Sequence, residues 1–167
     1  IPSARITLEG AVYFQQGSNL IQTIGQFPAV RYENTGEFTH YGLELAGTWE
    51  ALSFLTVEAN YSWLHMEDPI TGAPEHQLFT AFRFHHNKFA FRLSGMYING
   101  LYTSLVPEAI QDYFLLNARV SYQLFPFMNV WLSGDNLLDQ QYEINYDYPM
   151  PGITVFGGID FKFNTAQ

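Results

Sequence analysis

The stretch GITVFGGIDFKF, residues 152–163, separates into two chemically different sets when every second residue is taken. The first set is apolar and ends in aromatic residues: Ile153, Val155, Gly157, Ile159, Phe161 and Phe163. The second set includes a hydroxyl, an acid and a base: Thr154, Phe156, Gly158, Asp160 and Lys162. Because successive side chains of a β-strand point to opposite faces, the stretch predicts a strand with one apolar and one polar face.

Seven further segments show the same alternation, and together with residues 152–163 they predict eight strands. They are residues 6–14, 41–50, 55–64, 76–85, 89–98, 114–125 and 127–136. The segment 127–136 is the least regular, because Trp131 falls on its polar side. The period is two throughout, so the sequence predicts an all-β, antiparallel fold without a convincing helix.

The composition narrows the class of protein. The chain has 167 residues, which fits a single domain. Only 14% of its residues are charged, against about 25% in average globular proteins. No run of about 18 apolar residues could form a transmembrane helix, and the absence of cysteine excludes disulfides and thiolate metal sites. The net charge of −9 argues against a nucleic-acid partner, which needs basic patches.

The connections between the predicted strands differ in length at the two ends. Short turns are expected at residues 50–51, 85–88 and 125–127. Long polar loops are expected at residues 25–38, 66–75, 102–113 and 139–151. Short turns at one rim and long loops at the other are typical of an outer-membrane β-barrel, whose long loops face the outside of the cell.

Aromatic residues gather near the ends of the predicted strands. Those near the short-turn rim are Trp49, Phe89, Phe125, Phe127 and Phe163. Those near the long-loop rim are Tyr61, Trp63, Tyr97 and Tyr113. Two such girdles match the two interfaces of a membrane with water.

A soluble sandwich or small ligand-binding barrel would show the same period, with its apolar face inward. The distribution of charge favours the membrane barrel instead, because the apolar faces have no charge at any strand centre. We expect the polar faces to line a lumen whose charges include Arg83, Arg92, Arg119, Asp160 and Lys162. Strands of about 10 residues also suit a tilted crossing of the bilayer.

The segment SGDNLLDQQYEINYDYPMPGITVFGGIDFKF, residues 133–163, resembles the closing hairpin of TonB-dependent outer-membrane receptors. The matching positions are Asn136, Leu137, Leu138, Asp139 and Tyr142, followed by Pro149, Pro151, Gly152 and the aromatic Phe163. Leu138 stands where phenylalanine is usual, and Ile153 where arginine is common. The inner hairpins, residues 32–50 and 55–72, look similar to those of the same family.

The resemblance implies a barrel of about 22 strands filled by a plug domain. Residues 1–163 would be its last eight strands, followed by a tail at residues 164–167. The implied function is active uptake of a scarce nutrient across the bacterial outer membrane. The implied partners are the plug, the energy-coupling protein TonB, outer-membrane lipid and lipopolysaccharide, a small nutrient cargo and, as a further candidate, a surface lipoprotein. The alternative within the membrane class is a self-contained eight-stranded barrel with a structural or adhesive role.

The sequence predicts no enzyme, no cofactor and no resident metal. Ser62 and His65 are the nearest approach to a nucleophile and base. The pair His85–His86 falls in a short turn, where solvated polar residues are common. The remaining weak signals are His40, His65 and His76 near the long-loop side, and Glu67 and Asp68 before Gly72 as a faint calcium loop. A divalent cation that bridges loop acids to lipid phosphates is an alternative that the sequence does not exclude.

The long loops are strongly acidic. Their acids are Glu33, Glu37, Glu67, Asp68, Glu75, Glu108, Asp112, Asp139, Glu143 and Asp147, against the single base Arg31. Such a mouth repels anions, so a cargo such as cobalamin or a metal chelate, siderophore or haem of low charge is expected. Five loop tyrosines offer amphipathic contact area for it: Tyr102, Tyr113, Tyr142, Tyr146 and Tyr148.

Overall fold

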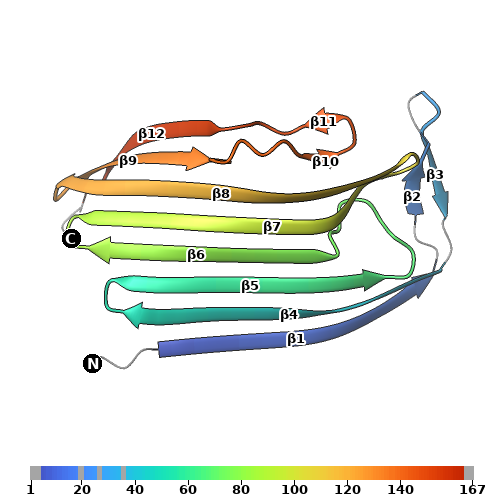
Figure 1. Cartoon of the computed structure of the whole chain (residues 1–167), viewed down its shortest axis with the longest axis horizontal. Helices are drawn as coiled ribbons and strands as arrows, with labels where there is room; N and C mark the ends of the chain where they lie inside the picture. The colour runs from blue at the N-terminus through green and yellow to red at the C-terminus, as the bar shows by residue number, and fades with distance from the viewer. Residues whose placement is uncertain (1–4, 19–20, 26–27, 35–36, 164–167) are drawn as a thin grey trace.

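The computed structural model describes residues 5–18, 21–25, 28–34 and 37–163, and within these ranges it is all-β. Eight antiparallel strands form one sheet in the order β1-β4-β5-β6-β7-β8-β9-β12 (Figure 1). Their bounds are β1 (Arg5–Ser18), β4 (Glu37–Leu52), β5 (Leu55–Met66), β6 (His76–His86), β7 (Phe89–Leu105), β8 (Glu108–Phe125), β9 (Met128–Asp135) and β12 (Thr154–Phe161). The eight predicted strands are confirmed, and the predicted tail at residues 164–167 lies outside the described residues.

Two small hairpins lie at or within the segments expected to be loops, and the first strand of one precedes the predicted loop 25–38. One pairs β2 (Ile21–Ile24) with β3 (Arg31–Asn34), and the other pairs β10 (Glu143–Asn145) with β11 (Tyr148–Pro149). Figure 1 shows both at the long-loop end of the sheet, opposite the short turns. The predicted division into a short-turn end and a long-loop end is therefore confirmed, but two of the loops carry strands of their own.

Two predicted connections were placed wrongly. The turn expected at residues 50–51 lies at residues 53–54, because β4 and β5 pair as far as Leu52 and Leu55. The loop expected at residues 102–113 is mostly strand, since β7 runs to Leu105 and β8 starts again at Glu108. Apolar–polar alternation weakens in this segment while the backbone ladder continues, so the hydrophobic pattern did not reveal the strands.

Cross-strand register joins the apolar sides of all strands into one face. One row across the sheet consists of Trp49, Val57, Phe82, Leu93 and Ala118. The side chains of this face stay open to the surroundings, and Val12 is 85% exposed. Such a face needs an apolar environment, which agrees with the prediction that it meets lipid.

The opposite face is polar and hollowed. A hollow of about 530 Å³ has Glu9, Glu44, Asn60, Ser62 and Gln77 among its lining residues. No helix among the described residues is long and apolar enough to cross a membrane.

The two outer strands of the sheet are not partners of each other. Strand β1 pairs only with β4, and β12 pairs only with β9, among the described residues. They lie at opposite edges of the sheet (Figure 1). A closed eight-stranded barrel would require a β1–β12 ladder, so the alternative of a self-contained barrel is not the arrangement seen here.

Candidate functional site

The β10–β11 loop is anchored on the polar face near the long-loop end. A small buried cluster there consists of Ile98, Leu101, Tyr113 and Leu115, with Tyr142 packed against it. The rings of Tyr113 and Tyr142 are 4.4 Å apart between centroids. The segment between β9 and β10, which contains Tyr142, therefore packs on β7 and β8 through apolar contacts.

Asn136 fixes the path of this loop as it leaves β9. Its side-chain amide donates to the carbonyl oxygens of Gln140 at 2.9 Å and Pro151 at 3.2 Å, and its Oδ1 accepts the N–H of Gln140 at 2.9 Å. Asn136 is 5% exposed, and its φ of 50° is one that asparagine tolerates better than most residues. Asp139 adds a second tie, because its Oδ1 accepts the N–H of Ile153 at 3.2 Å.

The structure divides the five predicted ligand-binding tyrosines into different environments. Tyr113 is buried, and Tyr142 is half-buried against it. Tyr102 lies opposite Ile110, on the other side of the sheet from Tyr113. Tyr146 and Tyr148 are 43% and 73% exposed, so these two offer the free ring surface at the loop end. The placement of Tyr113 in an outer aromatic girdle was wrong, because its ring lies under the loop on the polar face.

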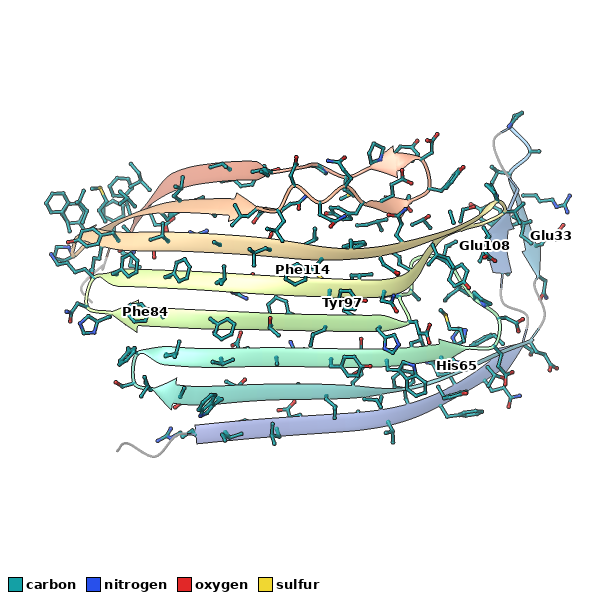
Figure 2. All side chains as sticks on the ribbon, in the orientation of Figure 1. Glu33, His65, Phe84, Tyr97, Glu108 and Phe114 are labelled. Carbon is teal, nitrogen blue, oxygen red and sulfur yellow. The ribbon has the colours of Figure 1, made fainter. Side chains whose placement is uncertain are left out.

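The loop acids also divide into two groups. Four are engaged locally: Asp112 accepts the N–H of Gly100 at 2.7 Å, Glu143 accepts that of Asp147 at 2.9 Å, Asp139 binds Ile153, and Glu33 pairs with Arg31. Others are exposed and form no ion pair within the described part of the chain: Glu37, Glu67, Asp68 and Glu108. Figure 2 shows Glu33 and Glu108 at the long-loop end. The rim therefore keeps a net negative charge from acids that have no basic partner among the described residues.

The predicted lumenal charges lie on the polar face. Arg83 is opposite Arg92, and Arg92 is opposite Arg119, so the three arginines form one cross-strand row. Trp131 shares this face, and its ring lies 3.9 Å from the Arg119 guanidinium. Its Nε1–H donates to Asp160 Oδ1 at 3.4 Å. The sequence predicted the face on which each residue lies, but only the register between strands shows that the three arginines form a row.

Lys162 follows the end of β12 and is exposed. Its backbone N–H donates to the carbonyl of Phe127 at 2.8 Å, which ties it to the short-turn rim.

The weaker candidates do not assemble into a reactive site. Ser62 shares its face with Glu44 and Gln77, whereas His65 pairs with Tyr41 on the other face of β5. The serine and histidine therefore cannot act on one substrate group.

The histidines of the long-loop side each contact a different aromatic residue. The ring of His65 lies 4.8 Å from that of Tyr41, and His76 Nδ1 lies 2.8 Å from the hydroxyl of Tyr61. His40 is buried in β4 beside the ring of Phe38. Within the described ranges, no three His, Asp or Glu side chains are grouped to hold a metal ion.

The amino-acid sequence of the chain was compared with models of known protein families, and one family matches. The TonB-dependent receptor-like β-barrel family matches residues 2–137. The chain belongs to this family. The match covers the inner hairpins but ends at Leu137, near the start of the closing-hairpin segment, residues 133–163. The family is therefore confirmed mainly by residues that precede this segment. Proteins of this family lie in the bacterial outer membrane, which confirms the predicted localisation, and they are transporters and receptors.

Solved structures of similar shape have very different sequences. The copper transporter OprC aligns with a TM-score of 0.76 at 13% identity, over 95% of this chain and 29% of that protein. The ferric-catecholate import receptor Fiu of E. coli K12 gives a TM-score of 0.72 at 14% identity, over 95% and 25%. The iron transporter FrpB of Neisseria meningitidis gives 0.71 at 13% identity, over 95% and 29%. The chain thus spans less than a third of each, and no curated protein sequence matches it.

Proposed function

We propose that residues 1–163 form part of the wall and outer loops of a receptor that takes up a scarce nutrient with energy passed through TonB. The sheet carries this proposal, because it has a lipid face, a polar face and two edges that require further strands. A plug domain would fill the lumen, and the cargo would enter from the long-loop end. Outer-membrane lipid, lipopolysaccharide and a surface lipoprotein are the other proposed partners.

The proposed cargo is cobalamin or a metal chelate, siderophore or haem of low charge. The free acids Glu37, Glu67, Asp68 and Glu108 support this, since they repel anions and concentrate cations at the mouth. The exposed rings of Tyr146 and Tyr148 could contact the apolar parts of such a ligand. The names of the similar structures, which concern copper, ferric catecholate and iron, agree with a metal complex.

Uptake by cells that produce the full-length receptor tests the proposal. We expect labelled cobalamin or a neutral ferric chelate to enter these cells, and entry to stop when TonB is deleted. A highly anionic ferric catecholate should enter more slowly. Uptake that persists without TonB would contradict the transport mechanism, and faster uptake of the anionic chelate would contradict only the cargo class.

A pair of loop variants separates the effect of mouth charge from that of stability. Glu67→Gln together with Asp68→Asn removes two negative charges at the loop between β5 and β6, and should raise the uptake of the anionic chelate relative to the neutral one. Glu50→Gln is the control, which removes one charge at the short-turn end of β4, beside the turn to β5. An equal effect of both substitutions would exclude the mouth as the origin of selectivity.

A further inference from the structure

The row of Arg83, Arg92 and Arg119 places three like charges side by side. Each arginine is the direct cross-strand partner of the next. Directly opposed side chains on one face have Cβ atoms about 4.5–5.5 Å apart, and like charges at that separation destabilise a sheet. Anions beside the row on the polar face would therefore stabilise the sheet.

Close to the row, a carboxylate of the wall forms an ion pair with only one of the three arginines. Glu58 Oε2 lies 2.7 Å from Arg83 Nη2 and neutralises that arginine. Arg119 lies over the ring of Trp131, and Arg92 lies 6.0 Å from the ring of Phe79. An aromatic face attracts a guanidinium but does not cancel its charge. Among the described residues, neither Arg92 nor Arg119 forms an ion pair with a carboxylate.

A hollow of about 290 Å³ opens beside these two arginines. Its lining consists of Arg92, Ser94, Asn117, Ala118, Arg119, Ser133 and Asp135. Hydroxyl and amide groups can donate hydrogen bonds to the same oxyanion that the guanidiniums attract. Asp135 is the only acid of this lining, so two cations face one carboxylate around the hollow.

We infer that Arg92 and Arg119 bind a carboxylate side chain of the plug domain, an inference that rests on the proposed receptor function. Charge complementarity gives the chemistry, because adjacent guanidiniums can hold one carboxylate through charge-assisted hydrogen bonds. The stacking of Arg119 on Trp131 holds one of the two guanidiniums in place before the plug arrives.

The position of the site along the barrel favours the plug over a cargo molecule. Arg92 is close to the start of β7 at Phe89, at the short-turn end. The mouth loops lie at the opposite end of the sheet (Figure 1). A cargo that enters between those loops meets Tyr146 and Tyr148 first, whereas a domain that fills the lumen lies against the arginine row.

Zero-length cross-linking tests the contact in the purified full-length receptor. Arg92→Lys keeps the positive charge and supplies an amine that a carbodiimide joins to a touching carboxylate, with loss of water. We expect mass spectrometry to find an amide link from position 92 to an acidic residue of the plug. Ser121→Lys is the matched control, because Ser121 shares the polar face beside Trp131 but lies outside the arginine row. It should link to the plug far less than the lysine at position 92 does.

Hydrogen exchange gives an independent measurement. Arg92→Gln together with Arg119→Gln should speed exchange in the linked plug segment by roughly tenfold, the factor that about 1.4 kcal/mol produces. The amides of β7 and β8 should exchange as before. Unchanged protection of the plug would overturn the inference.

Three cross-linking results would also overturn it: no link, a link only to Asp135 or Glu58 of the wall, or a link that forms only when a carboxylated cargo is added. TonB-dependent uptake by the same protein keeps the two proposals apart. Uptake without a plug link rejects the arginine site alone, whereas a plug link without TonB-dependent uptake rejects the transport function alone.

Discussion

At the scale of single residues, Val120 and Ser121 are neighbours in β8 that meet different surroundings. Val120 lies opposite Phe91 and Leu132 on the apolar face, and Ser121 lies on the polar face. Val120→Arg should lower the free energy of unfolding of the full-length receptor by about 2–4 kcal/mol, because the charge loses water without gaining a partner. Reversible unfolding from lipid bilayers measures this change.

Ser121→Arg is the control for that substitution. The added guanidinium would stay in the polar lumen, so we expect a far smaller loss of stability than at Val120. Equal losses at the two positions would show that the assignment of faces along β8 is wrong.

Asn136 combines burial, a positive φ and three side-chain hydrogen bonds in one residue. Asn136→Ala should destabilise the loop by about 1–3 kcal/mol, the usual cost of leaving buried polar partners unsatisfied. We expect faster hydrogen exchange at the amide of Gln140, which loses its acceptor. Asn136→Asp keeps that acceptor oxygen and should protect Gln140 better than alanine does. Equal exchange in both variants would show that the side-chain oxygen does not hold the loop.

At the scale of elements, the β10–β11 hairpin is held to the wall by a few apolar contacts and by the N–H of Tyr146, which donates to the carbonyl oxygen of Thr103. Tyr142→Ala removes the ring that packs on Tyr113 and should free the loop from β7 and β8. Limited proteolysis of the full-length receptor should then cut between residues 143 and 149 faster than in the unaltered protein.

Tyr148→Ala separates a structural role of these tyrosines from a ligand-binding role. Tyr148 is largely exposed, so its loss should leave the proteolysis rate unchanged while weakening cargo binding. If Tyr148→Ala loosens the hairpin as much as Tyr142→Ala, the Tyr113–Tyr142 contact is not what anchors the loop.

At the scale of the whole molecule, the open edges predict where cross-links can form. Val12 lies opposite Leu43 in the β1–β4 ladder, whereas β1 and β12 share no ladder. Residues 1–167 contain no cysteine, so within this part of the receptor the introduced pair supplies the only thiols. In the full-length receptor, Val12→Cys with Leu43→Cys should form a disulfide, and Val12→Cys with Ile159→Cys should not, because bridging requires Cα atoms within about 7 Å.

Efficient oxidation of the Val12–Ile159 pair would mean that the two edges meet. The wall would then close on itself as a small barrel, and the proposed need for further strands would be wrong. Failure of the Val12–Leu43 pair would instead question the register of β1 against β4.

The sequence could predict the features that depend on neighbours along the chain. Strand number, the face of Arg119 or Val120, and the division between short turns and long loops follow from alternation, because lipid and lumen select opposite side chains at every step. The prediction of strands failed where this alternation of side chains ends. The strands between residues 102 and 113 continue past the alternating region, and nothing local distinguished them from a polar loop.

The tertiary structure alone decided which residues meet across strands. The arginine row, the stacking of Arg119 on Trp131 and the burial of Tyr113 under Tyr142 all join residues from different elements. The sequence by itself determined that these side chains are polar-faced or aromatic and how often they recur. Their partners depend on register and on where each turn falls, and moving a turn by a few residues, as at residues 53–54, re-pairs the strands it joins.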